Sequence, residues 1–303
     1  MTIYDEKKRM HFKRGKGPYP SALEAARSSH GAEQTPQCRS QSYKLAFQDD
    51  EFLLWDELRP TRIQLEVLKP ELMLQDYQID STVVVFGSSR IQDPDQARHN
   101  LAQVEERLRL DPDNTALIQA LNTARRDLKN SSYYTQARRL GQLISSSTPE
   151  GRMLVITGGG PGIMEAANRG AHDLQARSIG LNIVLPHEQA PNTFITPELC
   201  FRFHYFATRK MHFLMRAKGL VAFPGGFGTL DEIFETLTLL QVQKIKPIPV
   251  ILFGPEFWTR VIDFEALVDE GTIDHSDLRL FQYVETAEQA WEIIANWNDL
   301  DES

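Results

Sequence analysis

A glycine-rich turn between an apolar run and an amphipathic segment is the feature that most constrains how this chain can fold. The stretch from Gly219 to Gln243 reads GLVAFPGGFGTLDEIFETLTLLQVQ. Its apolar run ends at Pro224, and beyond the glycines the apolar residues recur at the three- and four-residue spacing of one helical face. The pattern predicts a strand, a turn and a helix. Glycine lets the backbone approach a ligand closely, and unpaired N–H groups at a helix start attract an anion. We therefore expect the turn to bind a phosphate.

The same arrangement occurs twice more along the chain. Residues Met153 to Thr157 form a β-rich run, Gly158 to Gly162 the turn, and Ile163 opens a helix-forming segment. Another buried strand, Thr82 to Phe86, is followed by the turn Gly87 to Arg90. Strands that alternate with helices form a parallel sheet covered on both faces, and ligands bind outside the carboxyl ends of its strands. The three turns are therefore expected to share one crevice, which a nucleotide-like ligand would bridge.

The rest of the chain continues the α/β alternation. Further strands are predicted at 179–185, 201–206, 248–253 and 281–284, and helices at 207–218, 255–270 and 287–297. Between Pro94 and Ser147 we expect three helical stretches, separated at 111–114 and 130–132. The predicted fold class is α/β, a doubly wound parallel sheet with an N-terminal helical extension.

Three regions are predicted from these patterns. Residues 1–50 show no sustained period and are expected to be a poorly ordered or wrapping extension. Residues 51–78 are expected to hold two short helices, broken at Pro60. Residues 79–303 are then the nucleotide-binding domain, and a chain of this length can bury its large core.

Composition narrows the function further. The sequence has no run of 18 apolar residues and no apolar signal core near its start, which predicts a cytoplasmic protein. Its two cysteines, Cys38 and Cys200, form no disulfide framework and lack metal-ligand spacing. His187, His204 and His212 do not cluster at that spacing either, so no metal is expected. The net charge of −8 argues against a general nucleic-acid-binding protein.

Two common nucleotide-binding patterns are missing. The dinucleotide fingerprint needs a third glycine or alanine, but that position is Ile163 when read from Gly158 and Gly160. Read from Gly160 and Gly162 it is Glu165, and the Gly87 turn has no second glycine. The Walker pattern is absent as well, which argues against a nucleoside-triphosphate hydrolase.

The charged residues near the turns each have a structural and a functional interpretation. Thr229 and Glu232 fit a capping box, in which Thr caps the helix and Glu reaches back to it, yet Glu232 also lies at the mouth of the phosphate turn. Glu165 could simply complement the helix dipole. Arg209 and Lys210 could be ordinary surface charges.

Three segments together resemble one known family. Residues 158–171 (GGGPGIMEAANRGA), 208–210 (TRK) and 224–232 (PGGFGTLDE) are similar to the Lonely-Guy family of nucleotide phosphoribohydrolases, long labelled "possible lysine decarboxylase". The resemblance covers the chain from about Thr82 to Trp297. It implies a Rossmann-like fold, a dimer or higher homo-oligomer, and hydrolysis of the N-glycosidic bond of nucleoside 5′-monophosphates without a cofactor.

The resemblance also implies roles for individual residues. It gives catalytic roles to Arg209 and Glu232 and phosphate binding to the turn that precedes Glu232. Substrate or phosphate contacts are expected from the glycine turns and their neighbours: Gly87, Ser88, Gly158, Gly159, Gly160, Glu165, Lys210, Gly225, Gly226, Gly228 and Thr229. The segment Leu185 to Gln189 looks more like the larger bacterial nucleosidases than the short plant members, so the preferred base stays open.

Two alternatives remain at this stage. One is a non-catalytic nucleotide or molybdenum-cofactor carrier of similar fold. The other is a pyridoxal-phosphate decarboxylase, which would need Lys210, Lys218 or Lys246 as its Schiff-base lysine.

Overall fold

The computed structural model describes residues 19–28, 35–146, 153–186 and 190–299. The chain divides into two compact units, residues 1–77 and 78–303. Residues 1–18 and 29–34 of the predicted N-terminal extension lie outside the described residues, as do Ser147, at the end of the predicted helical stretch, and His187 to Gln189.

The described regular elements of the N-terminal unit are all helices. Its elements are α1 Ala22–Ser28, the 3-10 turns η2 Gln41–Tyr43 and η3 Ala46–Gln48, α2 Asp50–Leu53, η4 Asp56–Leu58 and α3 Arg59–Asp76. Asp49 caps α2 by accepting a hydrogen bond from the backbone N–H of Phe52. Pro60 lies in the first turn of α3, where its missing N–H leaves no hydrogen bond unmade.

The second unit contains a sheet of seven described strands, all parallel to their neighbours. They are β1 Ser81–Phe86, β2 Met153–Thr157, β3 Ser178–Ile183, β4 Cys200–Phe203, β5 Ala217–Ala222, β6 Val250–Phe253 and β7 Gln282–Val284. Their spatial order is β4-β3-β2-β1-β5-β6-β7. The predicted α/β class with a doubly wound parallel sheet is confirmed. The order reverses at β1, so the ends of β1, β2 and β5 form the switch point where ligands bind in such sheets.

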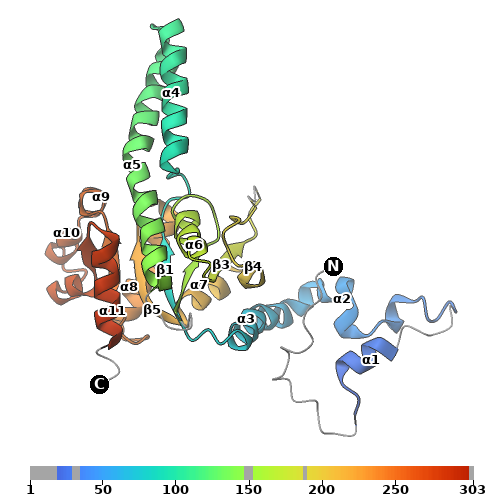
Figure 1. Ribbon diagram of the computed structural model, residues 1–303. Coiled ribbons are helices and arrows are strands. Elements are labelled where there is room, and N and C mark those ends of the chain that lie inside the picture. The colour runs from blue at the N-terminus through green and yellow to red at the C-terminus, as the bar shows by residue number, and fades with distance from the viewer. Residues whose placement is uncertain (1–18, 29–34, 147–152, 187–189, 300–303) are drawn as a thin grey trace. The chain divides into compact units, whose positions relative to one another are not determined.

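Helices cover the sheet on both faces (Figure 1). The described helices of this unit are α4 Pro94–Leu110, α5 Thr115–Ser146, α6 Ile163–Asp173, α7 Phe206–Leu214, α8 Phe227–Gln241, α9 Pro255–Val261, α10 Phe264–Asp269 and α11 Ala287–Asp299, with 3-10 turns η6 Pro197–Leu199 and η7 His275–Leu280. Alternate strand residues point to opposite faces. Val83, Val85 and Val221 meet α5, α6 and α11, whereas Phe86 packs edge-on against Phe213 of α7.

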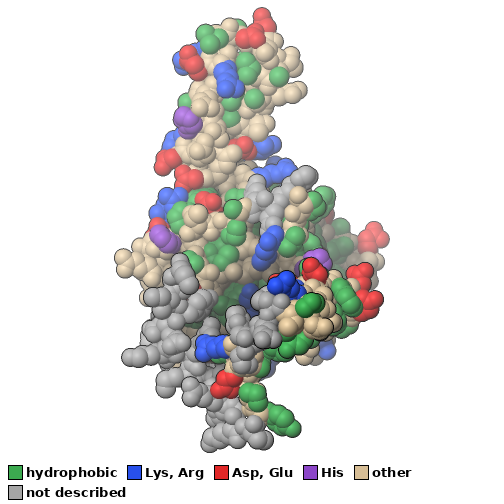
Figure 2. Space-filling view, turned by 90° about the vertical axis from the view of Figure 1, so that its right-hand side faces the viewer, with side chains coloured by type: hydrophobic (Ala, Val, Ile, Leu, Met, Phe, Trp, Pro, Cys, Tyr) green, Lys and Arg blue, Asp and Glu red, His purple; other side chains and the backbone are tan. Residues whose placement is uncertain are grey.

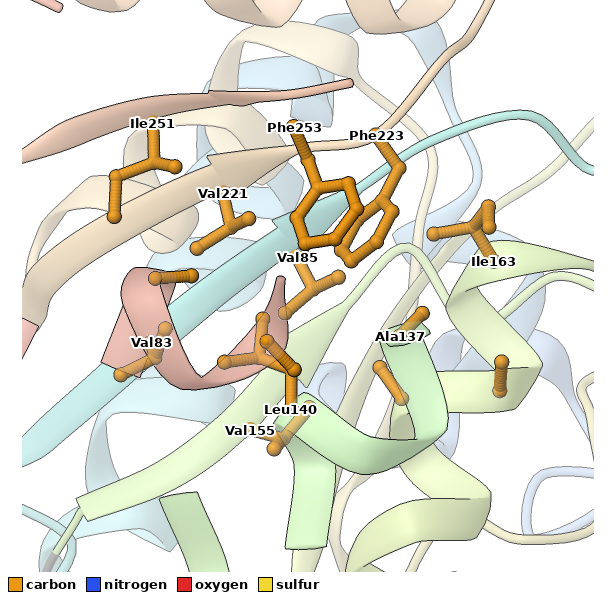
Figure 3. Packing of buried hydrophobic residues seen from close by; sticks show 14 of the residues in the cluster. Val83, Val85, Ala137, Leu140, Val155, Ile163, Val221, Phe223, Ile251 and Phe253 are labelled. Atoms are coloured by element: carbon orange, nitrogen blue, oxygen red, sulfur yellow. The ribbon is translucent and has the colours of Figure 1, made fainter. Parts of the chain in front are cut away.

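The core between the sheet and α5, α6 and α11 is a cluster of buried hydrophobic side chains. Leu140 and Ala137 of α5 lie over Val155 and Val85, while the rings of Phe223 and Phe253 stack 4.3 Å apart at the ends of β5 and β6 (Figure 3). Burial of such apolar side chains contributes about 25 cal/mol per Å² removed from water. This core fixes the strand ends from which the glycine turns leave.

Helices α4 and α5 form a hairpin whose tip projects from the sheet (Figure 1). Its exposed surface carries both signs of charge among apolar side chains, seen at the top of Figure 2, with ion pairs such as Arg109–Glu106. The predicted break at 130–132 is wrong, because α5 runs through it. Ser131 and Ser132 donate hydrogen bonds to the carbonyls of Leu128 and Lys129, so both hydroxyls are satisfied inside a continuous helix.

Two other predicted boundaries are wrong. Ala217 and Lys218 were expected at the end of a helix, but Ala217 opens β5 and pairs with Thr82 of β1, since strand pairing overrides local propensity here. The helix expected over 255–270 is two helices. Ile262 between them is extended, and Asp263 caps α10 by accepting from the N–H of Ala266.

Candidate active site

The three glycine-rich turns lie against one another at the carboxyl ends of β1, β2 and β5. The N–H of Ser88 donates to the carbonyl of Pro224 at 3.0 Å, and the N–H of Ile163 donates to the carbonyl of Ser88 at 3.1 Å. The turn after β1 is therefore hydrogen-bonded to the other two. A Cβ on Gly87 would lie 2.6 Å from a methyl carbon of Ile163, so only glycine permits this contact.

The turn after β2 adopts backbone angles that favour glycine. Gly159 and Gly162 have φ values of 76° and 72°, in the left-handed region. A Cβ on Gly162 would also lie 2.4 Å from the carbonyl oxygen of Ser88. A side chain at Gly162 would push the turns after β1 and β2 apart, whereas one at Gly159 would meet the side chain of Asn182.

A buried amide network supports the same turn. The side-chain amide of Asn192 donates to the carbonyls of Gly159 and Gly160 at 3.2 and 3.0 Å, and to the amide oxygen of Asn168 at 3.0 Å. Thr157 donates to Asn168 as well, at 2.8 Å. Sequence reasoning missed both asparagines. The one feature of the sequence that could have indicated this network is Asn168, a polar residue on the buried face of α6.

Arg209 is held in place by backbone, aromatic and glycine contacts. Its Nε donates to the carbonyl of Leu181 at 2.7 Å, and its guanidinium carbon lies 5.2 Å from the centre of the Phe213 ring. A Cβ on Gly158 would lie 2.6 Å from Nη2 of Arg209. Burial lowers the pKa of Arg209, while the charge of Glu232 opposes that shift. These contacts hold the side chain of Arg209 in one orientation beside the turn after β2.

Glu232 is buried in α8, with 8% of its surface exposed. Helix α8 begins at Phe227, its N-cap is Gly226, and no side chain caps it, so the capping-box interpretation of Thr229 and Glu232 is wrong. Burial raises the pKa of Glu232 to about 7, against the opposing charges of Lys210 and Arg209. A buried carboxyl with such a pKa next to a specific cation is typical of a functional site.

Lys210 points to the acidic side of α8. Its Nζ lies 2.8 Å from a carboxylate oxygen of Asp231 and 2.8 Å from one of Glu235. Burial lowers the pKa of Lys210, but the hydrogen bonds to these carboxylates outweigh it and leave the pKa raised. Such a lysine stays protonated, which makes it a poor Schiff-base nucleophile.

In the turn before α8, one glycine leaves no room for a side chain, and two others have free space where a side chain would begin. A Cβ on Gly225 would lie 2.1 Å from Oγ1 of Thr229, which is itself buried, whereas Cβ atoms on Gly226 or Gly228 would meet nothing within 4 Å. Phe227 between them is 92% exposed. Open space therefore lies next to the backbone N–H groups that begin α8.

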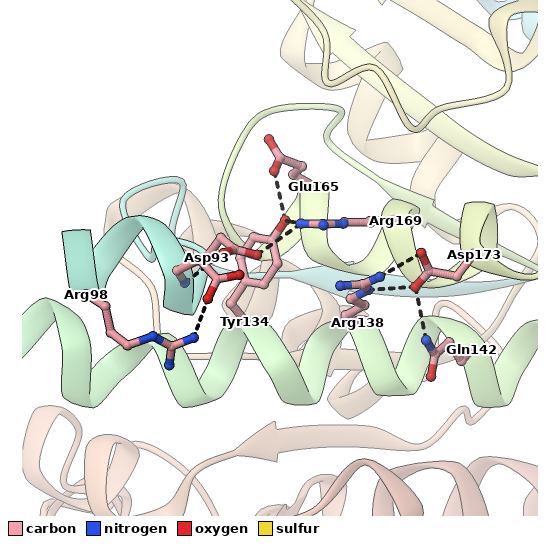
Figure 4. Close-up of polar contacts among 9 residues, drawn as sticks. Asp93, Arg98, Tyr134, Arg138, Gln142, Glu165, Arg169 and Asp173 are labelled. Carbon is pink, nitrogen blue, oxygen red and sulfur yellow. Dashed lines mark hydrogen bonds and ion pairs between the residues drawn. The ribbon is translucent and has the colours of Figure 1, made fainter. Parts of the chain in front are cut away.

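Glu165 is the remaining predicted contact, and α5 holds it. The hydroxyl of Tyr134 donates to Oε1 of Glu165 at 2.8 Å (Figure 4). Arg169 bonds the same hydroxyl at 3.4 Å and Asp93 at 3.0 Å. Burial raises the pKa of Tyr134 to about 12, so the hydroxyl remains a donor. Through these contacts, α5 and the start of α4 are linked to the first two turns of α6. The sequence did not predict this link.

The described residues contain no group of three or more His, Cys, Asp or Glu side chains arranged to hold a metal ion. Within that same part of the chain, no helix combines the length and the apolar character that crossing a membrane would require. The Leu185–Gln189 motif falls partly outside the described residues, so its resemblance to the larger nucleosidases stays a prediction.

Comparisons with known proteins give one family. Residues 164–294 match the family described as "Possible lysine decarboxylase". A probable cytokinin riboside 5′-monophosphate phosphoribohydrolase of Oryza sativa subsp. japonica is 28% identical over 162 residues, 52% of this chain and 63% of that protein. A pyrimidine/purine nucleotide 5′-monophosphate nucleosidase of Escherichia coli K12 is 30% identical over 159 residues, 48% of this chain and 32% of that protein. The chain thus spans less than two thirds of either relative.

Two solved structures are among those similar to this chain. A molybdenum cofactor binding protein from Rippkaea orientalis is 19% identical, with a TM-score of 0.42, over 72% of this chain and 96% of that one. The Moco carrier protein from Chlamydomonas reinhardtii is 18% identical, with a TM-score of 0.41, over 73% of this chain and 99% of that one.

Proposed function

Because this chain carries a lysine decarboxylase-like domain of the Lonely-Guy family, we propose that it hydrolyses nucleoside 5′-monophosphates to free base and ribose 5-phosphate. The observation that carries the proposal is the buried carboxyl of Glu232, electrostatically coupled to the fixed guanidinium of Arg209.

In the proposed reaction, the bond between C1′ of the ribose and the base nitrogen breaks, and its electron pair leaves with the base. Positive charge develops on C1′ and the ring oxygen, as in glycoside hydrolysis. A water oxygen then bonds to C1′. One proton of that water is lost, and the base takes up one proton, so the products are neutral base and ribose 5-phosphate.

Glu232 is proposed to stabilise the developing positive charge and to accept the proton of the attacking water. A carboxylate in a water-poor site interacts strongly with such a charge. Its pKa of about 7 leaves both protonation states available near neutral pH, which is the range in which a general base works best.

Arg209 is proposed to position the substrate relative to Glu232. Its Nε is occupied by the carbonyl of Leu181, which leaves the two terminal nitrogens of the guanidinium for ribose or phosphate oxygens. Lysine has no equivalent planar fork.

The turn from Pro224 to Thr229 is the proposed seat of the 5′-phosphate. The N–H groups at the start of α8 and the positive end of its dipole attract a dianion. The open space at Gly226 and Gly228 admits one. The other two glycine turns, with Glu165 in the first turn of α6, are proposed to surround the nucleoside. Lys210, held by Asp231 and Glu235 of α8, is proposed to add positive charge beside Glu232.

The test is chromatographic detection of bases released from a panel of nucleoside 5′-monophosphates. We expect Glu232→Gln to lose about 10² to 10³ in kcat, the cost typical of one lost electrostatic group. Glu270→Gln, an exposed carboxylate beyond α10, serves as the matched control and should keep full activity.

Two results would count against the proposal. Unchanged turnover in Glu232→Gln would remove the catalytic role of that residue. Tight nucleotide binding with no base released from any substrate would instead favour the carrier alternative. We also expect a homodimer or higher homo-oligomer, which light scattering on the full chain measures.

A further inference from the structure

A cavity of about 580 Å³ lies at the opposite edge of the sheet from the glycine turns. Asp80, directly before β1, Ala217, at the start of β5, and Ile248, just before β6, all line it. Because the strands are parallel, these residues mark the amino edge. The turns leave the carboxyl edge, about 17 Å away along the six residues of β1. A ligand in this cavity would not occupy the turns.

The wall of the cavity carries an excess of positive charge. Lys210, Arg216, Lys218 and Lys246 line it, against Asp80 and Glu235. Lys210 is neutralised by its ion pairs with α8. Within the described residues, however, no ion pair is formed by Lys218 or Lys246. Two lysines that form no ion pair with the described part of the chain thus line the same cavity.

Apart from Asn298, the rest of the wall is apolar and includes an aromatic ring. Trp297 of α11 lines the cavity and is 37% exposed, and Met211 and Met215 are exposed there by 43% and 45%. Indole rings stack on planar groups, and methionine adapts its shape to them. Cavities of roughly 300 to 1,000 Å³ with apolar walls and a few convergent polar groups bind small molecules.

We propose that this cavity is a second ligand site, which binds a phosphate-bearing organic anion with a planar ring, about the size of a nucleotide. Lys218 and Lys246 hold the phosphates, and Trp297 and the methionines contact the ring. The inference does not depend on the proposed hydrolase activity, because binding is measured without turnover.

The site is tested with 8-anilinonaphthalene-1-sulfonate, an aromatic anion that fluoresces when it enters an apolar pocket. The full chain is titrated beside the double variant Lys218→Glu/Lys246→Glu. The matched control is Lys244→Glu, an exposed lysine near Lys246 that does not line the cavity. We expect the double variant to bind at least about tenfold more weakly, a loss of 1.4 kcal/mol, and the control to bind as the wild type does.

A second variant separates loss of the site from loss of the fold. Trp297→Leu keeps both lysines and is expected to weaken binding of the dye, while circular dichroism of each variant reports its folding. Equal affinity in wild type and folded double variant would overturn the proposal, as would the absence of saturable binding to the wild type.

The two-part character of the ligand is tested by displacement of the dye. Adenosine 5′-triphosphate is expected to displace it at a lower concentration than either inorganic triphosphate or adenosine. If inorganic triphosphate displaces the dye equally well, the ring contributes nothing. If adenosine does, the lysines contribute nothing. Either result would overturn the assignment.

Discussion

Glu232 carries a carboxyl group that burial keeps partly protonated near neutral pH. Its pKa is raised from 4.5 to about 7 in the folded protein. Between these values the folded state binds more protons than the unfolded state, so the free energy of unfolding falls as pH rises. The decrease attributable to this group is on the order of 3 kcal/mol, since each pKa unit corresponds to 1.36 kcal/mol.

Glu232→Gln should remove this pH dependence, because the amide does not titrate. As pH rises from about 4.5 to 7, we expect the free energy of unfolding of the variant to increase relative to that of the wild type. Above pH 7 the difference between the two should stay constant. Urea denaturation across that range measures the effect, with Glu270→Gln as the control. Parallel pH profiles for wild type and Glu232→Gln would show that the group is solvated.

Gly158→Ala tests whether the orientation of Arg209 matters. The added methyl would lie 2.6 Å from Nη2 of Arg209, the far end of a flexible side chain that can move aside. We expect a folded protein with at least about tenfold lower kcat/KM, since small misplacements of a positioning group are costly. Gly226→Ala adds a methyl where no protein atom is within 4 Å, and its unfolding midpoint should match that of the wild type. Full activity in Gly158→Ala would exclude a positional role for Arg209.

The candidate site was partly predictable from single residues. The glycine turns could be predicted because each directly follows an apolar run in the sequence. Arg209 and Glu232 could be predicted because each lies in a short sequence motif. The capping box was wrong because helix α8 begins three residues earlier than an N-cap at Thr229 would place it. The support from Asn192 and Tyr134 could not be predicted, since it joins residues far apart in sequence through side-chain hydrogen bonds.

At the scale of elements, two glycines let the backbones of α5 and α6 come into contact. A Cβ on Gly141 would lie 2.2 Å from the carbonyl oxygen of Ala167, and one on Gly170 would lie 2.0 Å from that of Arg138. Both obstacles are backbone atoms, which cannot rotate away. We expect Gly170→Ala to lower the free energy of unfolding by about 1 to 3 kcal/mol, the usual cost of overpacking.

Denaturation with urea measures this loss. Asn122→Ala, an exposed change on α5, should alter stability by less than about 0.5 kcal/mol. A neutral Gly170→Ala would mean that the two helices can separate at little cost.

The extent of α5 shows where local signals are insufficient. Asn130, Ser131 and Ser132 are typical of a turn, yet the helix continues because it packs on α6 and α11, whose side chains share its core. The alternation of strands and helices, by contrast, depends on periodicity alone and gave the fold class correctly. Tertiary packing decides the boundaries, and a single sequence does not display it.

At the scale of the whole domain, the cavity and the turns are joined by α7 and α8. Lys210 and Glu235 line the cavity, and the same helices carry Arg209 and Glu232. If both sites bind as proposed, adenosine 5′-triphosphate should change kcat/KM for monophosphate hydrolysis, within the 5- to 150-fold range usual for coupled sites. The Lys218→Glu/Lys246→Glu variant should lose this response. An equal response in both proteins would indicate simple competition at the glycine turns.

The strand order has a consequence for how the protein is made. β1 lies between β2 and β5, so its Val83 pairs with Val155 on one side and with Gly219 on the other. During synthesis β2 leaves the ribosome well before β5. Until β5 has been synthesised, the backbone groups along one edge of β1, at Val83, Val84 and Val85, are unpaired. Other chains can pair with an edge of this kind. The nascent chain therefore passes through a stage at which the strand that precedes the first glycine turn is exposed to pairing with other chains.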